Sequence, residues 1–139
     1  MTQTRIYVPL DADGVRRLAA DREVAGTPVE AFAVTERLER MLPSGDEEEW
    51  EYAALTEAFE AADERRGTTV AKRVVLAADV DPTWVTSRAG TALSAVQLSQ
   101  PLPLSRVVSL HVDETAGDEG TDDLLWYDVT ELDEVLRLL

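Results

Sequence analysis

The chain has 139 residues, of which 45% are hydrophobic, and this is enough to build one domain with a sizeable core. Its 28 acidic and 13 basic residues give a formal net charge of −15, which argues against direct binding to nucleic-acid phosphates or anionic lipid headgroups. Because cysteine is absent, disulfides, thiolate nucleophiles and cysteine-based metal sites are excluded.

The first half of the chain is predicted to alternate strands with helices. Residues 5–10 form a short strand that stops near Pro9, and Asp11 caps the helix that follows. A second strand is expected at residues 29–34. Thr35 then starts a short helix, which is predicted to bury Leu38, Met41 and Leu42.

A long helix is predicted to begin after Asp46, which has the capping-box spacing to Glu49. Arg65 and Arg66 complement the helix dipole in its last turn, and Gly67 closes it. Its apolar side chains form one continuous arc on a helical wheel: Trp50, Tyr52, Ala54, Leu55, Ala58, Phe59, Ala61 and Ala62.

The second half is predicted to contain consecutive strands, at residues 73–79, 93–99, 107–113 and 124–127. Residues 114–123 form a polar surface loop between the last two strands. Thr130 is expected to cap a final helix, with core positions at Leu132, Val135, Leu136 and Leu139. The predicted fold is a single α+β domain spanning residues 1–139, with helices packed on a mixed β-sheet of about five to six strands.

Glu51 interrupts the apolar arc of the long helix, because it falls near the middle of the arc. A carboxylate on the core side of a helix needs a hydrogen-bond or ionic partner. Glu51 could therefore act as a buried general acid or base, or as an anchor for a cationic group. It could equally be solvated at the rim of the first helical turn, where the dipole favours it. A third interpretation is a structural ion pair with an arginine: Arg5, Arg73 or Arg106.

Asp79, His111 and Asp128 are the other candidate catalytic residues. Asp79 ends a predicted strand and would occupy a site position if that strand lay parallel in the sheet; otherwise it is a turn residue. His111 and Asp113 share one strand face, but a metal site needs three or four ligands and no other histidine exists, so no metal and no cofactor is predicted. The chain also lacks G-x-S-x-G, P-loop and G-x-G-x-x-G motifs.

Aromatic side chains supply the candidate binding residues Tyr52, Trp126 and Tyr127. Trp126 and Tyr127 lie between a predicted strand and the last helix, where they could line a pocket or seal an interface. The alternative interpretation is that they pack the terminal helix onto the sheet. Tyr52 lies beside Glu51 and belongs to the same candidate site.

Six segments of this sequence together resemble a family of short actinobacterial proteins that is catalogued only as a domain of unknown function. The segments are RIYVPL, AFAVTERLERML, GDEEEWEYAALTEA, KRVVLAADV, SAVQLSQPLPLSRVVSLHVDE and LLWYDVTELDEVL. The loop after Asp113 departs from the family pattern in being shorter and more polar. The resemblance implies a bacterial cytosolic protein, and it carries no activity and no functional residues.

The leading hypothesis is a non-catalytic cytoplasmic domain that binds a protein partner with a basic surface or associates with itself. No signal peptide is recognisable, and no segment approaches the ~20 apolar residues that span a bilayer, so no membrane partner is expected. The alternative is a small-molecule-binding protein or a carboxylate-based enzyme with a pocket near Glu51. A weaker alternative is a DNA mimic, whose carboxylates would be spaced like phosphates.

Overall fold

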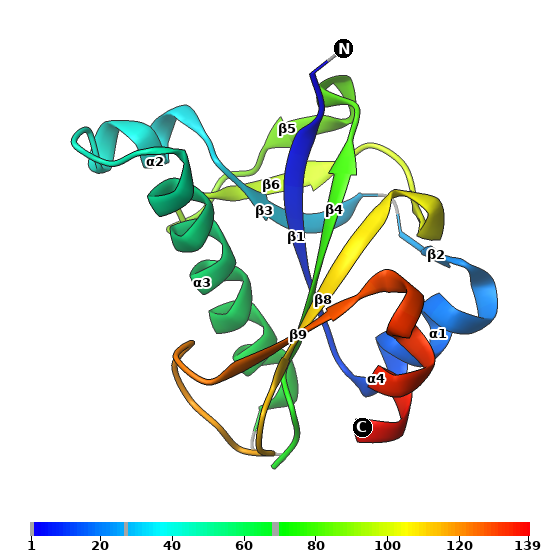
Figure 1. The fold of residues 1–139 in the computed structure, drawn as a ribbon. Helices are drawn as coiled ribbons and strands as arrows, with labels where there is room; N and C mark the ends of the chain where they lie inside the picture. The colour runs from blue at the N-terminus through cyan, green and yellow to red at the C-terminus, as the bar shows by residue number, and fades with distance from the viewer. Residues whose placement is uncertain (1, 27, 68–69) are drawn as a thin grey trace.

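A computed structural model describes residues 2–26, 28–67 and 70–139 of the chain (Figure 1). The strands are β1 (Thr4–Leu10), β2 (Glu23–Val24), β3 (Val29–Ala33), β4 (Val74–Val80), β5 (Val85–Ser87), β6 (Ala95–Leu98), β7 (Leu102–Pro103), β8 (Val107–Asp113) and β9 (Leu124–Asp128). The α-helices are α1 (Ala12–Asp21), α2 (Glu36–Met41), α3 (Glu47–Arg66) and α4 (Leu132–Leu138). Short 3₁₀ helices lie at η1 (Pro82–Trp84), η2 (Leu104–Arg106) and η3 (Val129–Glu131).

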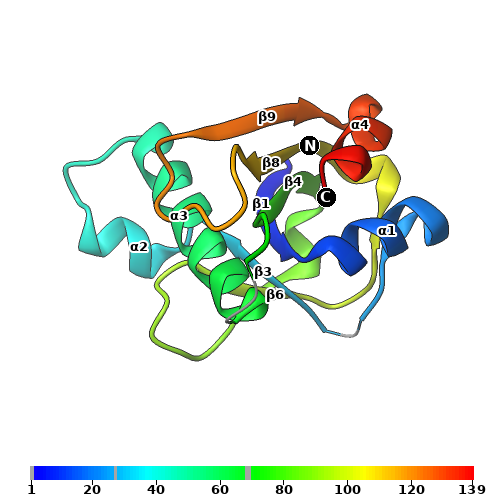
Figure 2. The same cartoon turned by 90° about the horizontal axis from the view of Figure 1, so that it is seen from below.

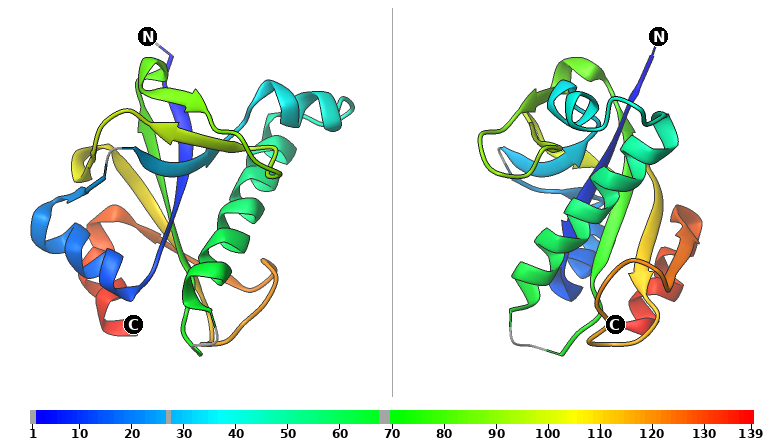
Figure 3. Two further views of the ribbon diagram at one scale, coloured as in Figure 1. Left: turned by 180° about the vertical axis from the view of Figure 1, so that it is seen from behind. Right: turned by 90° about the vertical axis from the view of Figure 1, so that its left-hand side faces the viewer.

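The main sheet has seven strands in the order β5-β6-β3-β1-β4-β8-β9, and each neighbouring pair is antiparallel. The predicted α+β class is confirmed, but the prediction of a mixed sheet of five to six strands was wrong. Helix α1 and the segment after it return the chain so that β3 pairs antiparallel with β1. The missed strand β5 has three residues, too few for a local pattern. The sheet twists strongly, so that β3 and β6 cross over β1 and β4, in front of them in the view from behind (Figure 3, left).

Alternating residues of the sheet supply two apolar clusters on its opposite faces. Ile6 and Val8 of β1 join one cluster, against which α1 and α4 pack, whereas Tyr7 joins the second cluster beneath α3. Figure 2 shows α3 on one side of the sheet and α1 with α4 on the other. Period-two alternation therefore decides which strand residues face α3.

Helix α3 forms as predicted, because both of its ends are capped. The Asp46 carboxylate accepts a 2.9 Å hydrogen bond from the Glu49 amide, and the Gly67 amide donates to the carbonyls of the last turn. Small residues on its inner face let the helix lie close to the sheet, and Phe59 is fully buried. Among the described residues, no helix combines the length and the apolar character that crossing a membrane requires.

Two local predictions about burial and capping were wrong. Met41 and Leu42 are 64% and 41% exposed, because α2 has six residues and stands away from the sheet, with only Leu38 reaching the core (Figure 1). Thr130 does not cap the last helix. Instead, its amide and hydroxyl donate to the Asp128 carboxylate at 3.0 and 2.7 Å, and one 3₁₀ turn precedes α4.

Candidate functional site

The polar groups of the candidate site lie on the sheet face that α3 partly covers. Arg5 stands opposite Asp79, Tyr7 stands opposite Ala77, and His111 stands opposite Val75. Because Val75 and Ala77 belong to the cluster beneath α3, all these side chains project from the same face. Helix α3 packs against β1, β3 and β4, which leaves β8 and β9 more open beside it.

Arg5 and Asp79 form a two-point ion pair across β1 and β4. The Arg5 Nε lies 2.6 Å from Asp79 Oδ1, and Nη2 lies 3.1 Å from Oδ2. The hydrogen bond to Asp79 raises the pKa of Arg5 above its usual value, although partial burial opposes that shift. The parallel-strand site proposed for Asp79 is wrong, because β4 is antiparallel to both neighbours and the carboxylate serves Arg5.

Tyr7 and Glu51 link the sheet to α3. The Tyr7 hydroxyl donates a long hydrogen bond of 3.4 Å to Glu51 Oε2. Burial, followed by the negative charge of Glu51, raises the pKa of Tyr7 to about 12, and the charge of Arg5 works in the opposite direction. Tyr7 therefore stays protonated at neutral pH and serves Glu51 as a donor.

No arginine pairs with Glu51 among the described residues. Arg5 is engaged by Asp79, Arg73 by Asp113, and the Arg106 guanidinium lies 5.3 Å above the Trp84 ring. The predicted ion pair of Glu51 was therefore wrong, and the position at the rim of the core was the better interpretation. Glu51 is half-buried, and among the described residues its side-chain hydrogen bond is the long one from Tyr7.

His111 is half-buried on β8, the strand that pairs with β4. Burial lowers its pKa below the usual 6.5, and the positive charge of nearby Arg5 lowers it further. The imidazole is thus neutral at physiological pH. The pair His111 and Asp113 is no metal motif, because Asp113 is buried against Arg73, and the described residues hold no cluster of three metal-ligating groups.

Acidification is expected to destabilise the protein through His111. Since the folded pKa lies below 6.5, the unfolded chain binds more protons in this window, and the free energy of unfolding falls as the pH drops from about 6.5 toward 5. His111→Gln should flatten that slope, as measured by urea unfolding at a series of pH values. His111 is the single histidine, so an unchanged slope in the variant would contradict its burial in the neutral form.

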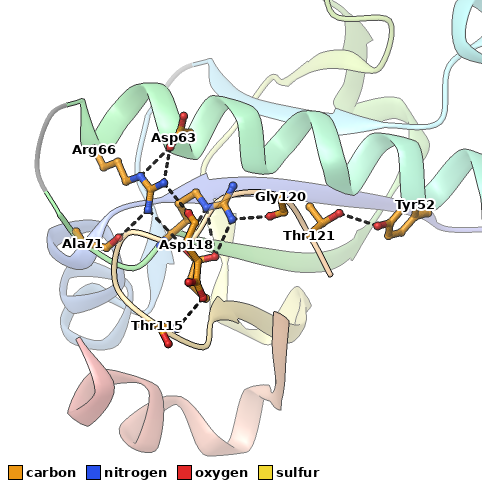
Figure 4. Close-up of polar contacts among 10 residues, drawn as sticks. Tyr52, Asp63, Arg66, Ala71, Thr115, Asp118, Gly120 and Thr121 are labelled. Carbon is orange, nitrogen blue, oxygen red and sulfur yellow. Dashed lines mark hydrogen bonds and ion pairs between the residues drawn. The ribbon is translucent and has the colours of Figure 1, made fainter. Parts of the chain in front are cut away.

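The aromatic candidates fall into two groups. Trp126 stands opposite His111 on β9, shares its face and is 59% exposed; it therefore does not pack the last helix onto the sheet. Tyr52 is 52% exposed, and its hydroxyl lies 2.6 Å from Thr121 Oγ1 in the loop before β9 (Figure 4). Tyr127 projects from the opposite face and packs against the other core cluster, as the alternative interpretation predicted.

Three of the four candidate catalytic residues lie in one polar cluster. Hydrogen bonds join Arg5 to Asp79 and Tyr7 to Glu51, whereas His111 is linked to them through the positive charge of Arg5 alone. Asp128 lies on the same face, opposite Ser109 of β8. Its carboxylate is engaged by Thr130, which lowers its pKa, and no hydrogen bond or ion pair joins it to the described residues of the cluster.

The cluster is open rather than enclosed. The side chains of Arg5 and Asp79 are 36% and 30% exposed. Cavities of about 500 Å³ lie elsewhere, one beside α3 at Phe59 and Arg73 and another at Arg22 and Val129. Neither is lined by Glu51, Asp79 or His111, so these cavities do not provide the predicted small-molecule pocket near Glu51.

A second polar network anchors the loop 114–123 and has a structural role (Figure 4). Arg66 donates to the carbonyls of Ala71 and Asp118 at 2.8 and 2.7 Å. Arg73 donates to the Gly120 carbonyl at 2.6 Å and pairs with buried Asp113. The loop is thereby held against the C-terminal half of α3, and it places Thr121 beside Tyr52.

Tyr7 was not recognised as a site residue from the sequence, and Arg5 was considered only as a partner for Glu51. The available signal was period-two alternation, which places Arg5 and Tyr7 on the same face of their strand. That signal could not show which face meets α3. The register with β4, which sets Arg5 opposite Asp79, is a tertiary feature.

Comparison with known proteins gives one match. A family model described as "Family of unknown function (DUF6912)" matches residues 4–136. No curated protein and no solved structure matches the chain.

Proposed function

The chain belongs to this family of unknown function, and on that premise we propose that it is a non-catalytic domain that binds a protein partner with a basic surface. The binding face is defined by Glu51 and Tyr52 of α3, His111 of β8 and Trp126 of β9. The net charge of −15 draws a basic partner toward the whole molecule.

Glu51 carries the proposal. Its half-buried carboxylate has a single long hydrogen bond of 3.4 Å from Tyr7 and no arginine or lysine within ion-pair distance in the described part of the chain. A carboxylate accepts several hydrogen bonds, so Glu51 retains acceptor capacity for a partner's cation. The neighbouring arginine, Arg5, is already neutralised by Asp79.

Exposed aromatic side chains on the same side of the sheet as Glu51 supply the other requirement of a binding face. Tyr52 and Trp126 are 52% and 59% exposed. Tryptophan and tyrosine are enriched at interface positions that contribute most to affinity, and their ring faces attract guanidinium and ammonium groups. A basic segment therefore finds both a charge partner and aromatic surfaces on one side of the sheet.

The ionisable groups of the cluster are less suited to catalysis. Tyr7, with a pKa of about 12, does not ionise at neutral pH, and Arg5 and Asp79 satisfy each other. A carboxylate-based enzyme or small-molecule binder remains the second candidate function, because Glu51, Asp79 and neutral His111 do lie together. Stabilisation by a small cationic molecule in a thermal-shift screen, lost in Glu51→Gln, would favour this second candidate.

Binding of a short arginine-rich peptide tests the proposal. Trp126→Ala is expected to weaken binding about tenfold or more, which corresponds to about 1.4 kcal/mol or more for an aromatic anchor. Glu51→Gln should weaken it severalfold through loss of the charge partner. Isothermal titration calorimetry at low and moderate salt measures both changes.

Glu47→Gln is the matched control, because Glu47 is exposed in the first turn of the same helix. It removes the same charge from the molecule and should change the dissociation constant by less than about twofold. Equal losses in the Glu47 and Glu51 variants would show attraction to the net charge alone and would contradict the proposed site. Urea unfolding confirms that each variant remains folded.

A further inference from the structure

Strand β9 leaves one edge of the seven-stranded sheet unpaired. It pairs with β8 on one side, and no other described segment forms a backbone hydrogen bond with its residues. Figure 2 shows β9 running along the border of the molecule, with α4 beyond its C-terminal end. Along such an edge, alternate backbone amides and carbonyls point outward and can pair with an added strand.

The edge at β9 differs from the opposite edge of the sheet. Strand β5 has three residues and directly follows the turn at Pro82, so it offers little length for pairing. Strand β9 has five residues, LLWYD, with no proline, no lysine and no bulge against β8. Proline, lysine and bulges are among the devices that block an edge, and β9 lacks these three. What it has instead is acidic residues at both ends: Asp122 and Asp123 before it, and Asp128 at its last position.

This charge pattern indicates which kind of strand can pair with the free edge of β9. If two copies paired antiparallel about Trp126, position 124 of one copy would face position 128 of the other, and Asp123 would lie near the partner copy's Asp128. A parallel pair would stack the same acids on each other. Like charges at neighbouring cross-strand positions are destabilising. The acidic ends therefore disfavour a second copy and favour a segment with basic residues at both ends.

The side chains of β9 define what lies between those basic ends. Trp126 projects on the α3 side, whereas Leu125 and Tyr127 project on the other side, half-buried. A strand added beside β9 alternates its own side chains in the same way, so that some cover Trp126 and others extend the surface of Leu125 and Tyr127. Apolar or β-branched residues fit these positions.

We propose that β9 accepts an extended segment of the basic partner as an additional strand of the sheet, with lysine or arginine at the ends of the segment beside Asp122, Asp123 and Asp128. This inference rests on the proposed function and specifies its mode of binding. Main-chain hydrogen bonds provide the affinity of such a complex, and the charged ends together with Trp126 provide its specificity.

A capped peptide tests the inference, with valine and threonine alternating between lysine–arginine ends. Two N-methylated versions carry methyl groups on one or the other set of alternate amides. Side chains and charge are then identical in all three peptides, and only one set of amides can face β9. One methylated version is expected to bind at least about tenfold more weakly and the other about as well as the parent. Tryptophan fluorescence measures binding, and amide hydrogen exchange should slow in residues 124–128.

The outcomes separate the two proposals. Equal binding of all three peptides would overturn strand addition while leaving the basic-partner function intact. Binding of the arginine-rich peptide without binding of the strand-forming peptide would likewise overturn strand addition and leave the basic-partner function intact. Failure of both peptides at low salt would overturn both proposals. A dimer in solution whose formation protects the amides of residues 124–128 from exchange and excludes the peptide would assign the edge to a second copy and overturn strand addition.

Asp122→Asn with Asp123→Asn gives an independent check on the charged ends. Both residues are exposed, so the change should not affect folding. The dissociation constant of the strand-forming peptide is expected to rise about threefold to tenfold at low salt, and the difference should shrink at high salt. An unchanged constant would overturn the role assigned to these two acids.

Discussion

Asp113→Ala is expected to lower the free energy of unfolding by about 3–5 kcal/mol, because it leaves a buried guanidinium without its carboxylate. The side chains of Asp113 and Arg73 are 1% and 5% exposed. Asp113 accepts hydrogen bonds from the Arg73 amide at 2.6 Å and from its guanidinium at 2.8 and 3.0 Å. Native domains are stable by about 5–15 kcal/mol, so the variant should be close to unfolding.

The loop 114–123 should respond to the same change. Arg66 lies 3.6 Å from Asp113 and reaches the Asp118 carbonyl, and Arg73 reaches the Gly120 carbonyl. Loss of the shared carboxylate removes one anchor from each arginine, so amide hydrogen exchange in the loop should accelerate along with global unfolding. Equilibrium urea unfolding, monitored by circular dichroism, gives the free energy, and exchange measured by NMR gives the local effect.

Two variants make this prediction specific. Arg73→Met combined with Asp113→Leu replaces both charges with apolar groups, and the double variant should be more stable than Asp113→Ala. Asp13→Ala removes one partner of an exposed pair, in which Arg16 and Asp13 are 58% and 77% exposed, and should cost no more than about 1 kcal/mol. A loss of under about 1 kcal/mol for Asp113→Ala would contradict the role assigned to the buried pair.

The elements that the sequence predicted well are those whose ends are determined locally. Helix α3 has its cap, its apolar face and its closing glycine within one continuous segment, and the structure reproduces all three except that Tyr52, predicted in the apolar arc, is 52% exposed. Strand β4 was recognisable from its uninterrupted apolar run. By contrast, β2 and β7 have two residues each and exist only because they pair with each other, which no local pattern predicts.

The candidate site was predictable to the same extent. The helical period showed that Glu51 breaks the apolar face, and the structure places it half-buried at that rim. Its partner Tyr7 lies 44 positions away, and the Arg5–Asp79 pair spans 74 positions. Strand order and register bring these residues together, and they depend on the packing of the whole sheet.

The buried pair of Arg73 and Asp113 illustrates the same limit. The sequence shows a charge at the beginning of one apolar strand and another at the end of a later one. They meet because β4 and β8 are antiparallel neighbours whose register sets Val74 opposite Val112. Had the strands been parallel, as the predicted mixed sheet allowed, these two charges would lie at opposite ends of the sheet.

Phe59→Ala is expected to lower the free energy of unfolding by about 3–5 kcal/mol. Phe59 is fully buried in the cluster between α3 and the sheet, and the Arg73 guanidinium lies 5.1 Å from its ring centroid. The substitution removes the apolar packing and the ring face on which Arg73 rests. Phe59→Leu retains most of the volume, so it should cost less than Phe59→Ala as measured by urea unfolding.

The ring and the guanidinium should be energetically coupled, because Phe59 holds Arg73 in the geometry that binds Asp113. A double-mutant cycle of Phe59→Leu and Arg73→Met is expected to give a coupling energy of about 0.5–2 kcal/mol, in the range of a shielded cation–π contact. Phe59→Leu preserves most of the core volume, whereas Arg73→Met leaves the buried Asp113 without its partner and should itself cost about 3–5 kcal/mol. Additive effects would show that Phe59 contributes packing alone and that Asp113 holds Arg73 without help from the ring. A positive coupling would instead show that the core beneath α3 is energetically linked to the loop that positions Thr121 against Tyr52. A core substitution would then affect the proposed binding face through Arg73.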